Sequence, residues 1–265
     1  MDDRELFDRE QAGLAEFYRR LVAPGSRSSR LIEREDLVAT IVPVAPDRSF
    51  CNAVVPESSQ GLSDAFEALA TAYEKAGVRA WTVWIPASDT RSALLLEQSG
   101  HVLDATPAAM ALELAEFEAT ADPIEVDAEP SFADVGAIND AAYGYDDFAP
   151  AIADLRDDAA HLYVTRVDGK PAACTVALDH DRDCVIAMVA TLPEARGRGL
   201  AAALMTRALL DARERGCETS SLQATQMGKP IYERLGYRDL GPLQMWERRD
   251  MRRSRSPRSG RSGRS

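Results

Sequence analysis

The segment from Arg196 to Ala201 (RGRGLA) combines two glycines and two arginines between an apolar strand-like run and an apolar helical run. Gly197 and Gly199 let the backbone approach a ligand without interference from a side chain. The first N–H groups of a helix lack partners, and the helix macrodipole adds partial positive charge at the same end. Arg196 and Arg198 add cations that can form charge-assisted hydrogen bonds. This combination predicts a pyrophosphate-binding turn.

Two other phosphate-binding motifs fit the segment less well. A P-loop requires GK[ST], whereas Gly228-Lys229 is followed by Pro230. A dinucleotide-binding turn requires GxGxxG or GxGxxA, and residues 197–202 match the second form. In that fold an acidic residue ends the next strand, but Glu218 precedes the strand expected here, and antiparallel hairpins come before the turn. A glycine-rich connector with solvated arginines is the remaining, non-functional alternative.

The elements around this turn have the pattern of an α+β domain. Asp168-Gly169 is a hairpin signal, and Gly216 and Gly236 are suited to end helices in the left-handed conformation. The expected strands cover residues 124–126, 162–167, 172–178, 185–191, 219–223 and 243–247, and the expected helices cover 132–142, 152–155, 199–215 and 230–235.

The turn and its flanking segments together resemble a known family. Residues 196–201 fit the acetyl-CoA loop of the Gcn5-related N-acetyltransferases (GNAT superfamily), which reads Gln/Arg-x-x-Gly-x-Gly/Ala. The strand before the loop ends in Val-Ala-Thr-Leu-Pro, and Ile231–Tyr237 (IYERLGY) fits the segment that follows the next strand in the family. The resemblance covers residues 124–248. It implies a mixed, largely antiparallel sheet flanked by helices and splayed open near the strand before the loop.

The resemblance also implies acetyl-CoA as co-substrate, no metal, and a set of site residues. Tyr232 would lie near the thioester sulfur and protonate the departing thiolate as general acid; a packing tyrosine is the alternative. A backbone N–H near Val189 would polarise the thioester carbonyl. The backbone of Val189, Ala190 and Thr191 would pair with the pantetheine arm, and Arg196, Gly197, Arg198, Gly199, Leu200 and Ala201 would hold the pyrophosphate.

The acceptor side of this site is less defined by the sequence. Tyr143 and Tyr145 lie in an acidic loop (YGYDDF) that lines the acceptor site in relatives, although a solvated surface loop is an equal alternative. A general base must deprotonate the incoming ammonium. Asp146, Asp147 and Glu194 are candidates for it by residue type only.

The first half of the chain repeats the element order of the second half. Gly61, Gly77, Gly100 and Met110 are spaced 16, 23 and 10 residues apart, and Gly199, Gly216, Gly236 and Met245 are spaced 17, 20 and 9 apart. This similarity predicts an internal duplication and two tandem acyl-CoA N-acyltransferase-like domains. Aligned on these glycines, Ser58 takes the place of Arg196 and Leu96 that of Tyr232. We therefore expect a degenerate, non-catalytic domain at 1–120, a catalytic domain at 121–250 and a disordered tail at 251–265.

The activity expected from these residues is direct transfer of an acetyl group from acetyl-CoA to a primary amine. A CoA-responsive binding or regulatory protein without turnover is the alternative. The net charge is −12, and residues 251–265 hold six arginines and no acid, so residues 1–250 carry −18. Such a body repels nucleic acid and suits a cationic amine, either a small molecule or a peptide. A homodimer is compatible with the sequence.

Two negative patterns bear on location. No apolar run is long enough to span a bilayer, and the charged N-terminus lacks a signal peptide's apolar region. The four cysteines form no CxxC pair, which favours a reducing cytoplasm over a disulfide scaffold or zinc site.

Overall fold

The computed structural model describes residues 1–119 and 124–249, so the tail expected to be disordered lies outside the described residues. Its first half begins with a long helix, which Asp2 and Glu5 start with a reciprocal capping box. The elements of this half are α1 (Asp3–Phe17), η1 (Tyr18–Val22), η2 (Ala23–Gly25), β1 (Arg30–Arg34), β2 (Leu37–Ile41), β3 (Ala53–Pro56), α2 (Ser59–Lys75), β4 (Ala80–Pro86), α3 (Thr90–Gln98), β5 (Val102–Ala105) and β6 (Ala108–Glu113).

The second half follows the expected order, but the helix expected at 152–155 is wrong in position, because the helix there is α5, which ends at Ile152. Its elements are α4 (Phe132–Tyr143), α5 (Phe148–Ile152), β7 (Ala160–Val167), β8 (Lys170–His180), β9 (Asp183–Thr191), η3 (Pro193–Ala195), α6 (Leu200–Glu214), β10 (Thr219–Ala224), α7 (Lys229–Arg234) and β11 (Arg238–Arg249). The strand expected at 124–126 is not formed. This segment instead lies along β7, where the Glu125 carbonyl accepts a hydrogen bond from Thr165 Oγ1 at 3.2 Å.

All the strands belong to one mixed, largely antiparallel sheet, in which the two halves have the same pairing pattern. In the first half β2 and β3 are antiparallel and β3 and β4 parallel; in the second half β8 and β9 are antiparallel and β9 and β10 parallel. The strand order is β1-β2-β3-β4-β11-β6-β10-β9-β8-β7, and β5 pairs with β11.

The two halves exchange their last strands. β6 belongs to the first half by sequence, yet it pairs with β10 and with residues 238–242 of β11. The remainder of β11, residues 243–249, pairs with β4, and residues 245–247 also pair with β5. The ladder therefore crosses the division expected at residue 120, although that division itself stays a prediction.

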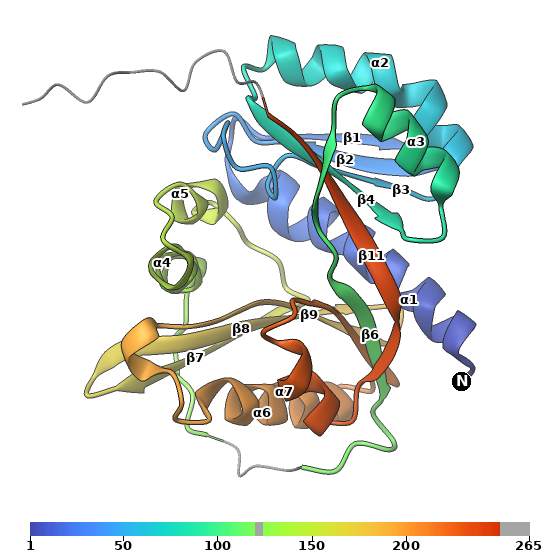
Figure 1. Cartoon of the computed structure of the whole chain (residues 1–265). Helices are drawn as coiled ribbons and strands as arrows, with labels where there is room; N and C mark the ends of the chain where they lie inside the picture. Colours follow the sequence, from blue (N-terminus) through green and yellow to red (C-terminus); the bar gives the residue numbers. More distant parts are fainter. Residues whose placement is uncertain (120–123, 250–265) are drawn as a thin grey trace, which may run out of the picture.

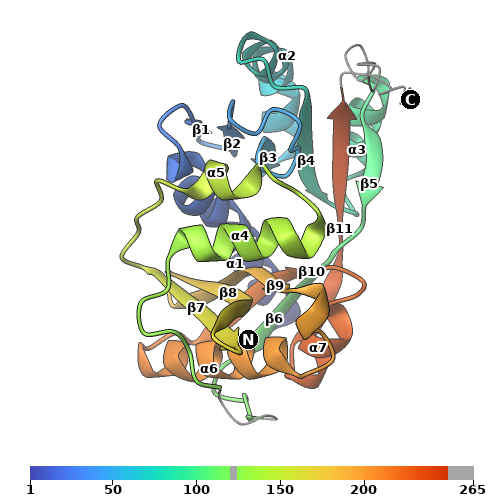
Figure 2. The ribbon, with the colours of Figure 1, turned by 90° about the vertical axis from the view of Figure 1, so that its left-hand side faces the viewer.

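Helices form layers on both faces of this sheet. In Figure 1, α2 and α3 cover the outer face of the first half, and α6 and α7 cover the outer face of the second. Between the two half-sheets lie α1, α4 and α5, and Figure 2 shows α4 and α5 stacked in this middle layer. The middle layer therefore contacts both halves at once.

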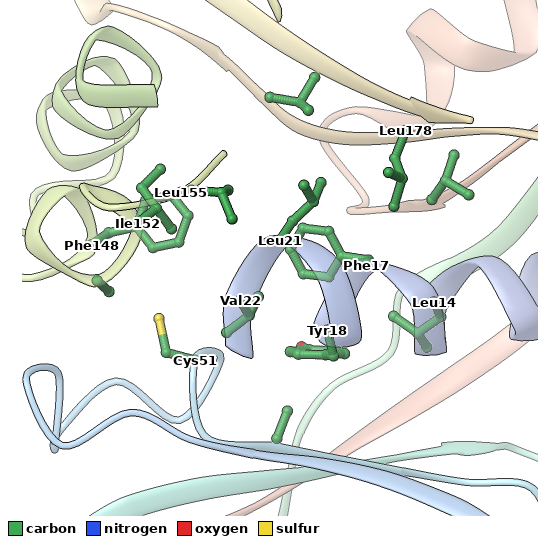
Figure 3. Packing of buried hydrophobic residues seen from close by; sticks show 14 of the residues in the cluster. Leu14, Phe17, Tyr18, Leu21, Val22, Cys51, Phe148, Ile152, Leu155 and Leu178 are labelled. Atoms are coloured by element: carbon green, nitrogen blue, oxygen red, sulfur yellow. The ribbon is translucent and has the colours of Figure 1, made fainter. Parts of the chain in front are cut away.

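A single hydrophobic core fills this middle layer. Figure 3 shows α1 and η1 side chains, among them Phe17, Tyr18 and Leu21, packed between elements of both halves. Tyr18 is fully buried, and its hydroxyl accepts a hydrogen bond from Trp84 Nε1 on β4 at 2.8 Å. The same cluster includes Leu178 on β8. The two halves are thus joined by core packing as well as by strand exchange.

Candidate functional site

The site forms where β9 and β10 separate. These neighbours pair in parallel only over Asp183–Val185 and Thr219–Ser221. Beyond that point β9 continues to Thr191 while β10 ends at Ala224. Strands that part in this way leave backbone donors and acceptors along their facing edges, which an extended ligand can use. The separation agrees with the splayed sheet that the sequence resemblance implied.

A bulge in β9 sets the direction of the strand just before the loop. Met188 has a φ of 53°, which a non-glycine residue rarely adopts, and the register of β8 and β9 shifts between Cys174 and Val176. The Met188 carbonyl accepts a hydrogen bond from Asn139 Nδ2 on α4 at 3.3 Å. Val189, Ala190 and Thr191, the residues expected to pair with pantetheine, follow this bulge directly. Sequence patterns gave no sign of it, because methionine does not favour this conformation.

The loop from β9 to α6 has the backbone that the glycines predicted. Gly197 and Gly199 have φ values of 76° and 75°, and a Cβ at either position would meet no atom within 4 Å. Gly199 caps α6, whose first bond runs from the Ala203 N–H to the Gly199 carbonyl at 3.0 Å. The N–H groups of residues 200–202 consequently have no partner inside the helix. The residues present fit a pyrophosphate, since open space, free donors and positive charge coincide.

The two arginines of the loop differ in what they contact. Arg196 donates to the carbonyls of Thr191 at 3.3 Å and Ala142 at 2.9 Å, so its guanidinium closes the loop onto β9 and α4. Arg198 is exposed beside the start of α6. Both charges remain near the loop. Of these two arginines, Arg198 has no side-chain hydrogen bond to any other described residue.

Tyr232 lies on α7 with only 8% of its surface exposed. Burial raises the pKa of Tyr232 well above its usual value of 10, and the neighbouring Tyr143 raises it further. Its ring lies 5.9 Å from that of Tyr237 in an edge-on arrangement. Gly228 allows this position, because a Cβ there would lie 3.0 Å from Tyr232 Cε2. The phenol is therefore protonated at neutral pH and able to donate.

The segment that joins α4 and α5 lies against β9, which we call the cofactor strand because its residues 189–191 are expected to pair with pantetheine. The Tyr143 hydroxyl donates to the Val189 carbonyl at 3.1 Å, and the rings of Tyr143 and Tyr145 are 6.5 Å apart. Of the three carboxylates considered as general base, Asp147 is bound by an arginine of the first half, Arg48. Asp146 and Glu194 are exposed. The segment thus lies against Val189 of β9, and the candidates for the base remain predictions from residue type.

The first half has no equivalent loop. β3 ends at Pro56 and Ser58 caps α2, so two residues separate strand and helix where β9 and α6 are separated by eight. By position at the helix start, Ser58 corresponds to Gly199, so the alignment that matched it with Arg196 was wrong. Gly61 lies inside α2 and is not a counterpart of Gly199. At the Tyr232 position, Leu96 is fully buried, and the glycines four residues on, Gly100 and Gly236, both have positive φ.

Within residues 1–119 and 124–249 no group of three or more His, Cys, Asp or Glu side chains could hold a metal ion. In the same part of the chain, every helix is too short or too polar to cross a membrane.

Comparisons with known proteins agree with this geometry. Residues 158–239 match the family model of the acetyltransferase (GNAT) domain. No curated protein matches the chain. A GCN5-related N-acetyltransferase from Kribbella flavida is 20% identical, with a TM-score of 0.63 over 88% of this chain and 95% of the other.

Two further solved structures have the same arrangement over most of the chain. A GCN5-related N-acetyltransferase from Sphaerobacter thermophilus is 17% identical, with a TM-score of 0.55 over 81% of each chain. A tandem GNAT protein from the clavulanic acid biosynthesis pathway is 12% identical, with a TM-score of 0.52 over 91% of this chain and 95% of the other. The chain thus has the GNAT fold, and its residues 158–239 match the acetyltransferase (GNAT) domain model.

Proposed function

We propose that the protein transfers an acetyl group from acetyl-CoA to a primary amine. The observation that carries this proposal is the pair of left-handed glycines, Gly197 and Gly199, at the start of α6 beside the point where β9 and β10 separate. This arrangement offers an anion site and an extended edge next to each other. A pyrophosphate joined to a linear pantetheine arm has the matching shape and charge.

Each part of the site has a role in this reaction. The N–H groups at the start of α6, with Arg196 and Arg198, hold the pyrophosphate. The backbone of Val189–Thr191 pairs with the pantetheine amides, and an N–H near Val189 polarises the thioester carbonyl. Tyr232 is the general acid.

The chemistry is a direct displacement. The neutral amine attacks the carbonyl carbon, a C–N bond forms and the C–S bond breaks. Tyr232 gives its proton to the sulfur as the thiolate leaves, and the proton lost by the amine passes to a carboxylate or to water. The raised pKa of Tyr232 keeps that proton available at neutral pH.

The acceptor we favour is a cationic amine, either a small molecule or a peptide. Two features support this choice. Residues 1–250 carry a net charge of −18, because the net −12 of the chain includes six arginines of the tail. The loop beside Val189 is also acidic. A cytoplasmic location is consistent with four cysteines that are all free and buried. The first half is proposed to be a degenerate copy, since it has the pairing pattern without the cofactor loop.

Gly199→Ala tests the cofactor site, and Gly216→Ala is its matched control. Both glycines have positive φ and open space around the missing Cβ, and they lie at opposite ends of α6. Each substitution is expected to destabilise the fold by about 1–2 kcal/mol through backbone strain. Only Gly199→Ala should weaken acetyl-CoA binding, by at least about tenfold, in a calorimetric titration. Equal affinities for the two variants would contradict the assignment of the loop.

Turnover is measured separately, as release of free CoA thiol with a panel of amines. Release above the rate without amine supports the transferase. Tight binding of acetyl-CoA with no release for any amine would favour the alternative of a CoA-responsive binding protein.

A further inference from the structure

An arginine from the first half reaches into the second half at the α4–α5 loop. Arg48 lies between β2 and β3, and its side chain is only 10% exposed. Its Nε donates to Asp147 Oδ1 at 2.9 Å, and its Nη2 also bonds that oxygen and lies 3.6 Å from Asp140 Oδ1. The guanidinium carbon lies 3.3 Å from the centroid of the Tyr145 ring. One side chain therefore contacts Asp140 on α4 and two residues of the loop that follows, Tyr145 and Asp147, almost a hundred positions later in sequence.

Asp140 shows why this contact determines the shape of the loop. Its carboxylate accepts hydrogen bonds from the backbone N–H groups of Phe148 at 3.1 Å and Ala149 at 2.9 Å, which begin α5. Its carbonyl accepts from the Tyr145 N–H at 2.8 Å. Asp140 and Asp147 both approach Arg48, so its removal would leave the buried carboxylate of Asp140 and the partly buried carboxylate of Asp147 without their shared cation. The loop closes around the guanidinium.

The same loop is joined to the cofactor strand on its other side. Tyr143 bonds the Val189 carbonyl, and Arg196 of the cofactor loop bonds the Ala142 carbonyl. The position of residues 143–148 is thus fixed by the cofactor site at one end and by Arg48 at the other.

We propose that Arg48 is a positioning residue. Through it, the first half holds residues 143–148 of the second half in place as one side of the amine site. The inference rests on the proposed function, because it takes residues 143–148 as part of the amine site. It assigns the first half a direct part in acceptor binding, although that half lacks a cofactor loop of its own.

The test uses the full chain with Arg48→Met, Arg48→Lys and, as matched control, Arg79→Met. Arg79 belongs to the same half and makes a similar arginine–carboxylate pair with Asp47, but this pair is exposed and includes no residue of the α4–α5 loop. Arg48→Met is expected to raise the KM for the amine at least about tenfold while kcat and the KM for acetyl-CoA change less than about twofold. Arg48→Lys should restore part of the effect, because lysine supplies charge without the planar fork. Arg79→Met should match wild type.

Hydrogen exchange of the backbone N–H groups of residues 143–149 provides a second readout that needs no substrate. Arg48→Met should speed exchange in residues 143–149 but not in the buried cluster between β2–β4 and α2, such as at Leu69. Arg79→Met should leave exchange in residues 143–149 unchanged. Unchanged exchange in Arg48→Met would overturn the proposal, and so would faster exchange with an unchanged amine KM. Wild-type protein that acetylates no amine would instead overturn the proposed function, and with it the acceptor role; exchange would then still report whether Arg48 holds the loop.

Discussion

Tyr232 differs from the other buried tyrosines of the second half in what its hydroxyl contacts. Tyr237 bonds Ser220 Oγ at 2.6 Å, and Tyr163 bonds Asp211 Oδ2 at 3.2 Å. In the described part of the chain, no group accepts a hydrogen bond from Tyr232. A buried phenol with an unused proton, close to Tyr143, suits a residue that gives its proton to a substrate.

Removing this proton should lower the rate without weakening cofactor binding. Tyr232→Phe is expected to lower kcat by about 100-fold or more, a typical contribution of general acid catalysis, with the KM for acetyl-CoA nearly unchanged. Tyr237→Phe is the control, since it removes a neighbouring hydroxyl that only bonds Ser220. In wild type, the raised pKa of Tyr232 should keep kcat free of a decline due to this group up to about pH 10. Equal kcat values for Tyr232→Phe and wild type would exclude the acid role.

Glu10 is a second residue whose environment has a measurable consequence. It is fully buried on α1, and burial raises its pKa to about 7, against the hydrogen bonds that it accepts from Gln223 and Gln11, each at 2.6 Å. Because the folded pKa lies above the unfolded value near 4.5, folding favours the protonated form. Stability from this group is therefore full below pH 4.5 and declines as pH rises to 7.

Glu10→Gln should remove that decline. The shift from 4.5 to about 7 corresponds to a few kcal/mol at most, at about 1.4 kcal/mol per pH unit. Urea unfolding of wild type should therefore show falling stability between pH 5 and 7, and Glu10→Gln should show a smaller fall and a higher stability at pH 8. Asp8→Asn removes an exposed charge from the same helix and should leave the wild-type slope in place. Parallel curves for Glu10→Gln and wild type would show that Glu10 stays ionised.

At the residue scale, the sequence could reveal only those parts of the site that a local motif carries. Gly197 and Gly199 were predictable because a tight turn before a helix requires their conformation. The left-handed conformation of Met188 and the contact of Arg48 with Asp147 depend on neighbours distant in the chain. Neither residue belongs to a pattern that a single sequence displays.

Helices and strands, too, were predictable where a local motif determines them and not where distant partners do. The β7–β8 hairpin formed where Asp168-Gly169 predicted it, and both residues have positive φ. Gly77, Gly100, Gly216 and Gly236 all follow helices with positive φ, as expected for helix ends. The sequence could not show that 124–126 forms no strand, because a short apolar run has no unique structure without its partner. The matching of Gly61 with Gly199 failed because similar spacing does not require similar conformation.

Strand exchange is the feature of the fold that local sequence patterns predict least. β11 changes partner near Gly241-Pro242, where φ of Gly241 is 113° and the register with β6 shifts between Asp239 and Gly241. Proline lacks an N–H for the ladder, and glycine tolerates the bend. A sequence can show such a break but not the sheet that the strand enters next. The exchange makes each half incomplete without the other.

At the scale of the whole molecule, three cores connect into one body. One core lies in the outer part of the first half, one in the outer part of the second, and the largest contains residues of both halves around α1. Separating the halves would expose that shared core and also break the ladders that β6 and β11 form. Neither half can therefore lose its structure while the other keeps its full set of contacts.

The described body should accordingly unfold in one transition, although chains of this length often unfold in several. Differential scanning calorimetry should give a calorimetric enthalpy close to the van't Hoff enthalpy. Leu69→Ala in the first-half core and Leu204→Ala in the second-half core each remove a fully or almost fully buried side chain. Each should destabilise by about 2–5 kcal/mol and move the same single peak to lower temperature, because a cavity in one half weakens the shared unit. Two peaks, with Leu69→Ala moving one and Leu204→Ala the other, would show that the halves unfold independently despite their exchanged strands.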